Sequence, residues 1–197
     1  MKGQMFLLAA IIIVTALFIL RVSLRAPTIM EERKLLELTF EKNIFDNLQT
    51  ELKKSARYSS NEKLSITTNV FDFGNFTREK MNEHALSFKF LFVGSLTNIS
   101  TQILNVSLIN LLKEPINATL NLNGSINTNI VIDGQRWDTY FSFTPGLTYV
   151  LTISYDNYDE TVIIRTKSDK DIFVGFFDIT LESFDSTYKS KFSETYA

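Results

Sequence analysis

Hydrophobic and polar positions change their spacing twice along the chain. Residues Gln4 to Leu20 form an uncharged, largely apolar run of 17 residues. From about 28 to 57, apolar residues recur at intervals of three, four and seven, which is the period of one helical face. From about Leu64 onward, hydrophobic and polar residues alternate, as they do in half-buried strands. The pattern predicts an apolar helix, an amphipathic helix and a sheet domain, in that order.

The apolar run is long enough to act as a membrane anchor. As a helix it would span about 26 Å, close to the ~30 Å hydrocarbon layer of a bilayer. The residues that follow offer no small-x-small cleavage pattern, so we expect the helix to be retained and to contact membrane lipid. Arg21 and Arg25 just beyond the run favour a cytoplasmic C-terminal side by the positive-inside rule.

The second segment has the features of an amphipathic helix over about 28–57. Thr28 and Glu31 have the spacing of a capping box at its start. Acidic residues near the start and basic residues near the end suit the helix dipole. The apolar stripe consists of Leu35, Leu38, Phe45, Leu48 and Leu52, widened by Leu36, Phe40 and Ile44. This stripe must be covered, either entirely by the domain's own sheet or partly by neighbouring subunits.

The remaining chain predicts short antiparallel strands. Apolar residues alternate with polar ones between Ile116 and Leu122, and Asn123–Gly124 then supplies a tight turn. Further turn dipeptides follow at intervals of about ten to twelve residues, as in a β-sandwich. These dipeptides are Asp133–Gly134, Pro145–Gly146 and Asp156–Asn157. The expected inward residues include Phe88, Phe90 and Phe92, then Trp137, Thr139, Phe141 and Phe143, and then Leu147, Tyr149, Leu151 and Ile153.

These elements divide the chain into four parts. They are a signal and membrane-anchor helix over 1–26, an amphipathic juxtamembrane helix over 27–60, a β-sandwich over 61–184 and a C-terminal tail over 185–197. The tail is expected to form a last edge strand or to lie loosely over the domain, where exposed Tyr188, Phe192 and Tyr196 would make a contact arm, and a frayed terminus is the alternative. A net charge of −2 with scattered lysines and arginines argues against nucleic acid as a partner. The absence of cysteine excludes disulfides and thiolate sites.

The segment from Pro145 to Leu151 resembles part of an immunoglobulin-like domain. Tyr149 lies two residues before Leu151, where antibody-type domains have a tyrosine two residues before their second cysteine. Leu151 stands in place of that cysteine. The resemblance covers about residues 64–184. The expected fold is therefore an N-terminal transmembrane helix plus an amphipathic helix, followed by an all-β immunoglobulin-like antiparallel sandwich.

Lys2–Gly3–Gln4 directly before the apolar run resembles the class III signal peptide of archaeal type IV pilin-like proteins. That resemblance implies cleavage between Gly3 and Gln4 by a prepilin-type peptidase, with the helix retained. It also implies helix packing against other copies or related pilin-like subunits. The helix residues expected to pack are Phe6, Leu7, Leu8, Ile11, Ile12, Ile13, Val14, Leu17 and Phe18. The chain departs from the pattern at Leu8, where many such pilins carry Glu. An ordinary uncleaved signal anchor is the alternative interpretation.

Five Asn-x-Ser/Thr triplets suggest an exterior location for the sheet domain. They begin at Asn75, Asn98, Asn105, Asn117 and Asn123. Chance alone would produce roughly three in a chain of this composition. Asn117 and Asn123 fall on the polar side of a predicted strand or in its turn, where glycans could project. The alternative is that asparagine is simply abundant in polar strand faces and turns.

The sequence predicts no enzyme, no cofactor and no metal site. His84 is the only histidine, and neither a Gly-rich phosphate loop nor a nucleophile elbow occurs. Acidic turn residues such as Asp156, Asp159 and Glu160, or Asp169 and Asp171, could hold calcium, but such residues are usually solvated.

Two functional hypotheses remain from the sequence. The first is a structural subunit, or minor subunit, of an archaeal surface filament or cell-envelope assembly. The second is a membrane-anchored extracellular binding module or adhesin that does not polymerise. Both place a single-pass protein in the cell membrane with its β-domain outside.

Overall fold

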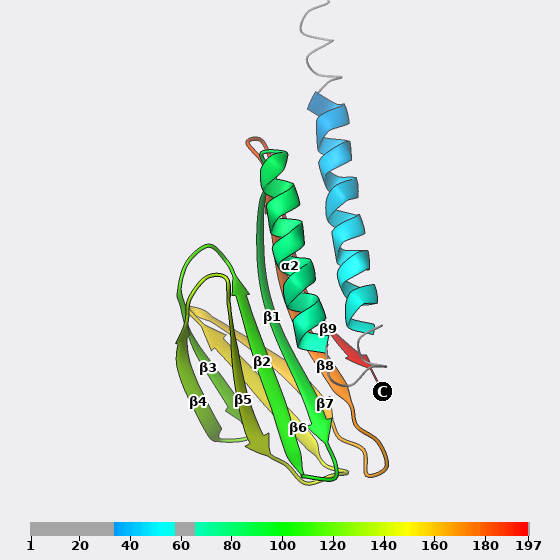
Figure 1. Ribbon diagram of the computed structural model, residues 1–197, viewed down its shortest axis with the longest axis vertical. Helices are drawn as coiled ribbons and strands as arrows, with labels where there is room; N and C mark the ends of the chain where they lie inside the picture. Colours follow the sequence, from blue (N-terminus) through cyan, green and yellow to red (C-terminus); the bar gives the residue numbers. More distant parts are fainter. Residues whose placement is uncertain (1–33, 58–65, 197) are drawn as a thin grey trace, which may run out of the picture. The chain divides into compact units, whose positions relative to one another are not determined.

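The computed structural model describes residues 34–57 and 66–196. A first helix covers 34–57, and α2 covers Ile66–Glu83 (Figure 1). The apolar run at 4–20 and the expected helix start at Thr28 lie outside the described residues. Within the part that is described, neither helix is long and apolar enough to cross a membrane.

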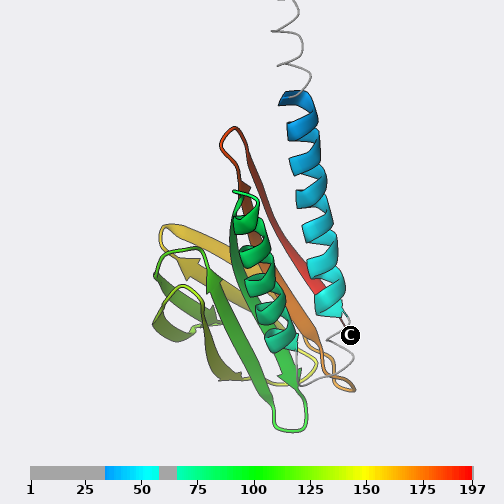
Figure 2. The ribbon, with the colours of Figure 1, turned by 45° about the horizontal axis from the view of Figure 1, so that its top comes forward.

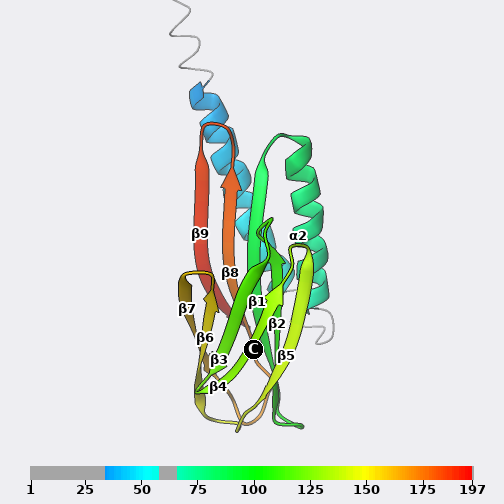
Figure 3. The ribbon, with the colours of Figure 1, turned by 90° about the vertical axis from the view of Figure 1, so that its left-hand side faces the viewer.

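Nine strands form two antiparallel sheets, which confirms the prediction of a two-sheet β domain (Figure 3). The five-stranded sheet has the order β5-β2-β1-β8-β9, and the four-stranded sheet has the order β4-β3-β6-β7. The strands are β1 (Ser87–Asn98), β2 (Ile103–Leu111), β3 (Ile116–Leu122), β4 (Ser125–Val131), β5 (Gln135–Ser142), β6 (Thr148–Tyr155), β7 (Tyr158–Arg165), β8 (Phe173–Glu182) and β9 (Thr187–Tyr196).

The chain divides into two compact units, Met1–Ile44 and Phe45–Ala197. In the first unit, the large apolar side chains of Leu35, Leu36 and Phe40 are exposed. In the second unit, Phe45 and Leu52 are buried. The helical residues from Phe45 onward pack against β9, where the ring of Phe45 lies 5.8 Å from that of Tyr188.

β1 is buried on both faces, because alternate residues serve two different layers. Phe88, Phe90 and Phe92 face the helical side, whereas Leu91 and Val93 join the core between the sheets. Figure 2 shows α2 lying along this strand. Gly94 pairs with Gly175 of β8, and an added Cβ at Gly94 would lie 2.7 Å from the Phe92 ring. The two glycines therefore make room for the aromatic layer.

α2 replaces the strand that the sequence predicts from about Leu64, so that expectation is wrong. The buried positions Val70, Gly74 and Thr77 are spaced by four and three residues, as on one helical face. A Cβ at Gly74 would lie only 2.8 Å from Leu111 and 3.1 Å from Phe90. The helix therefore approaches the sheet closely, and this tertiary packing outweighs the weak helix propensity of its Asn, Thr and Phe residues.

The core between the sheets contains only some of the predicted inward residues, because Phe88, Phe90 and Phe92 face the helical side instead. Phe141 and Phe143 are buried there, as are Leu151 and Ile153. Trp137 is partly buried against the same core. Leu147 is exposed, contrary to expectation, because it lies between the Pro145–Gly146 turn and the start of β6. Between β3 and β4, Asn123 and Gly124 both have positive φ, 48° and 96°, as a two-residue hairpin turn of type I′ requires.

Candidate functional site at the free edges of the two sheets

The free edge strands β7 and β9 bound one side of the sandwich (Figure 3). Within the described residues, β7 pairs only with β6, and β9 pairs only with β8. Along β9 the side chains alternate between half-buried positions and exposed ones, the latter being Thr187, Lys189, Lys191, Ser193 and Thr195. The exposed side of the strand is therefore entirely polar, whereas the half-buried side carries the aromatic residues Tyr188, Phe192 and Tyr196 together with Ser190 and Glu194.

A polar cluster joins the two sheets along this edge. We call it the Lys191 cluster, comprising Lys191 of β9, Asp178 of β8, Tyr155 of β6 and Glu160 of β7. Lys191 Nζ lies 2.8 Å from Glu160 Oε1 and 3.5 Å from Asp178 Oδ2. The Tyr155 hydroxyl donates to Asp178 Oδ2 at 2.6 Å and accepts from Lys191 at 3.2 Å. These contacts connect β8 and β9 of the five-stranded sheet with β6 and β7 of the four-stranded sheet. The two sheets are not paired with each other through the backbone.

The protonation states of the cluster suit a structural role. Burial raises the pKa of Tyr155, and its hydrogen bond to Asp178 acts in the same direction. Burial lowers the pKa of Lys191, but its hydrogen bonds with Glu160 and Tyr155 and the charge of Asp178 outweigh this, so the pKa is raised overall. Lys191 therefore stays charged and Tyr155 stays neutral at ordinary pH. Neither group is poised to act as a base or a nucleophile.

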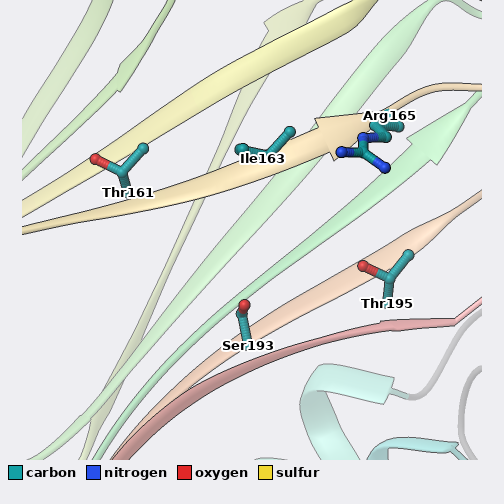
Figure 4. Close-up of a pocket in the computed structure, with 5 residues that line it drawn as sticks. All are labelled: Thr161, Ile163, Arg165, Ser193 and Thr195. Atoms are coloured by element: carbon teal, nitrogen blue, oxygen red, sulfur yellow. The ribbon is translucent and has the colours of Figure 1, made fainter.

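A groove of about 440 Å3 lies beside this edge (Figure 4). It is lined by Thr161, Ile163 and Arg165 of β7 and by Ser193 and Thr195 of β9. The lining offers hydroxyls, one guanidinium and one aliphatic side chain. Such a set can hydrogen-bond a hydroxylated or anionic group, but the described residues that line the groove include neither a carboxylate nor an imidazole for acid–base chemistry.

The acidic residues considered for calcium do not gather into a site. Within the described residues, no group of three or more His, Asp or Glu side chains is arranged to hold a metal ion. Glu160 is bound to Lys191, and Asp171 accepts a hydrogen bond from the backbone N–H of Ile99 at 2.9 Å. His84 is exposed in the turn after α2.

The five sequon asparagines lie in different environments. Asn117 of β3 and Asn123 of the following turn are exposed, and so is Asn105 of β2. Asn75 is half-buried on α2, and its Oδ1 accepts from Arg78 at 3.3 Å. Asn98 is half-buried, and its Oδ1 accepts from the Ser100 hydroxyl and the Thr101 N–H. Gly3, Gln4 and the predicted helix residues between Phe6 and Phe18 lie outside the described residues.

The aromatic residues of the tail form part of an edge strand, not an exposed arm. The ring of Phe192 stacks on Phe177 at 4.8 Å, and the Tyr196 hydroxyl donates to the carbonyl of Lys53 at 3.1 Å. Their alternation with polar residues was a visible strand signal. The Lys191 cluster was not predictable in this way, because the sequence does not reveal that Glu160 lies opposite Lys191.

The fold defines a class of protein in which helices lead into a two-sheet antiparallel β-sandwich. No protein-family model matches the chain, and no curated protein matches its sequence. The functional argument therefore rests on the arrangement of surfaces.

Proposed function

We propose that this protein is a pilin-like structural subunit, or minor subunit, of an archaeal surface filament or cell-envelope assembly. The change of exposure along the first helix carries the proposal. Leu35, Leu36 and Phe40 are 68%, 69% and 66% exposed, whereas Phe45 and Leu52 are 5% and 0% exposed. Burying one large apolar side chain contributes about 1.5–3 kcal/mol, so the exposed stripe has much to gain from a partner. In a filament, the helices of neighbouring copies would cover it.

The N-terminal sequence supports the same proposal. Lys2–Gly3–Gln4 would be the processing site for a prepilin-type peptidase, and the apolar run from Gln4 to Leu20 would pass from the membrane into the assembly. One continuous apolar side, from the anchor through Leu36 and Phe40, would then serve subunit packing. The domain itself would remain on the outer surface of the assembly.

We further infer that β1 to β7 form an immunoglobulin-like sandwich. The neighbours β1-β2-β5 in one sheet and β4-β3-β6-β7 in the other correspond to strands A-B-E and C′-C-F-G of that fold. The hairpin β8–β9 would be an addition beside β1. Tyr149 near the start of β6 accepts a hydrogen bond from the Thr144 N–H at 2.7 Å, as a tyrosine corner does. Such a domain acts through its surfaces.

The second candidate is a membrane-anchored extracellular binding module or adhesin that does not polymerise. The groove between Arg165 and Thr195 favours it, because a volume of about 440 Å3 is within the range of small-ligand sites. On this alternative, the exposed stripe of the helix would face lipid or another membrane protein.

Assembly can be tested by shearing native cells and sedimenting the released material. We expect the wild-type protein in the sheared, sedimenting fraction. Leu36→Glu and Phe40→Glu place a charge on the exposed stripe and should remove the protein from that fraction, since a buried unpaired charge is costly. Lys42→Glu is the matched control, because it introduces the same side chain about 200° around the helix from Phe40.

The outcome separates the two candidates. Thermal unfolding of each variant should match the wild type, because Leu36, Phe40 and Lys42 are all exposed. A wild-type protein that is released only by detergent, and never by shear, would contradict the pilin-like proposal and favour the anchored binding module.

A further inference from the structure

The four-stranded sheet has an outer face on which aliphatic side chains are exposed. Its inward residues, such as Leu120, Ile153 and Val162, belong to the core, so the residues between them point outward. Figure 3 shows this sheet in front, with α2 behind the five-stranded sheet. The exposed aliphatic residues of the outer face are Ile126, Ile130, Val150 and Ile163, with exposures of 60%, 66%, 42% and 53%.

Asn117 lies on this outer face near the start of β3. It is exposed, and it pairs directly across the strands with Ile130. Side chains paired in this way have Cβ atoms about 4.5–5.5 Å apart. Thr119, the hydroxyl residue of the same sequon, lies on the same face, with its Oγ1 3.1 Å from that of Thr128. No hydrogen bond to the Asn117 side chain occurs within the described residues.

Asn123 lies at the end of the same strand, in the hairpin turn. Its Oδ1 accepts a hydrogen bond from the Val150 N–H at 2.9 Å, which fixes the side chain beside that exposed valine. Val150 is paired in turn with Ile163 of β7. With Oδ1 occupied, the Nδ2 of Asn123 is the atom left available for modification. Ser125, the sequon's hydroxyl residue, is exposed.

Two other sequons contrast with this pair. At Asn75, the third residue of the triplet, Thr77, is 3% exposed on the buried side of α2. At Asn98, the side chain forms a closed turn with Ser100 and Thr101. Asn105 is exposed but lies on the other sheet. Only the sequons at Asn117 and Asn123 place an accessible asparagine beside the exposed aliphatic residues of the outer face.

We propose that Asn117 and Asn123 carry N-linked glycans that cover the outer face of the four-stranded sheet. In the transfer, Nδ2 forms a bond to C1 of the first sugar of a polyprenyl-phosphate-linked oligosaccharide. The bond between C1 and the phosphate oxygen breaks, the polyprenyl phosphate leaves, and Nδ2 loses one proton to a base of the transferase. The glycan is bulky and hydrophilic, and so it replaces the exposed aliphatic surface with a solvated one. The inference rests on the exported orientation that the proposed function also requires.

The test is peptide mass mapping of the full-length protein from its native cells. We expect sugar mass on the peptides containing Asn117 and Asn123, and none on those containing Asn75 and Asn98. Thr119→Val should remove the sugar at Asn117, whereas Thr119→Ser should keep it. Thr128→Val is the matched control: it breaks the same Thr119–Thr128 hydrogen bond, yet leaves the sequon intact and should keep the sugar. Ser125→Ala should remove the sugar at Asn123.

Either asparagine found unmodified in every wild-type peptide overturns its assignment, and sugar that persists in Thr119→Val overturns the mechanism at Asn117. If the unmodified chain instead self-associates and Ile130→Glu separates it, the face is an interface between copies and the inference fails. The N-terminus is read from the same sample. A chain that begins at Gln4 but carries no sugar would support the proposed function and overturn this inference. A glycosylated chain that begins at Met1 would support this inference and contradict the proposed function.

Discussion

The two sheets of the domain differ in how many of their faces are buried. In the five-stranded sheet, β1 has α2 on one face and the second sheet on the other, and nearly all its central residues are buried. In the four-stranded sheet, β4 buries only Val131. The first sheet thus provides most of the packing that holds the domain together, while the second presents a surface. The same kind of substitution should therefore lower the free energy of unfolding much more in the five-stranded sheet than on the outer face of the four-stranded sheet.

The largest expected effect tests this difference directly. Phe90 is fully buried between the rings of Phe88 and Phe92, at centroid distances of 5.9 and 6.2 Å. Phe90→Ala should lower the free energy of unfolding by about 3–5 kcal/mol, through lost burial and the cavity left behind. Ile130→Ala on the outer face should change it by less than about 0.5 kcal/mol. Urea denaturation measures both, and similar losses in the two variants would refute the comparison.

The first helix shows a similar contrast between buried and exposed apolar positions. Leu52 is fully buried in the second unit, so Leu52→Ala should cost about 2–5 kcal/mol. Leu36→Ala, at an exposed position of the same helix, should cost less than about 0.5 kcal/mol in the isolated protein. Thermal unfolding of the two variants checks this. A large loss for Leu36→Ala would mean that the first half of the stripe already packs within the chain.

A smaller effect should come from the corner between the sheets. Tyr149→Phe removes the phenol oxygen that accepts the Thr144 N–H, while keeping the ring against Phe143. We expect a loss of about 1 kcal/mol, the usual net contribution of one hydrogen bond. Tyr140→Phe is the control, since Tyr140 is exposed. An equal result for both would show that the corner hydrogen bond adds nothing to stability.

The weakest effect should appear at alkaline pH on the β9 edge. Burial and the charge of Glu194 raise the pKa of Tyr196 to about 12, from an ordinary value near 10. A raised pKa in the folded state stabilises the fold below pH 10, and that stability is lost as the pH rises from 10 towards 12. Chemical denaturation across this range should show the decline, and Tyr196→Phe should make it shallower. An unchanged slope would show that Tyr196 does not contribute.

Local periodicity predicted those parts of the fold that depend on local spacing. The alternation from Ile116 to Leu122 and the turn at Asn123–Gly124 both appear as expected. The helical stripe also identified Phe45 and Leu52 as buried. In each case the structure depends on residues a few positions away in the sequence, or only on whether a side chain is buried in the core.

Parts that depend on distant partners were not predictable. α2 was missed because Ile66, Val70 and Phe71 with nearby Thr residues are typical of strands, and only contact with Phe90 and Leu111 favours the helix. The Lys191 cluster joins residues from four strands of two sheets, and no spacing along the chain indicates that pairing. The groove lined by Arg165 and Thr195 was not predictable either, because it lies between β7 and β9, which are distant in the sequence.

The most direct test of the proposed function is the mass of the N-terminal peptide of the protein from its native cells. The account predicts a chain that begins at Gln4, because a prepilin-type peptidase would cut after Gly3 and free the helix for assembly. A chain that still begins at Met1 or Lys2 would contradict it, and would leave a membrane anchor that carries a binding domain.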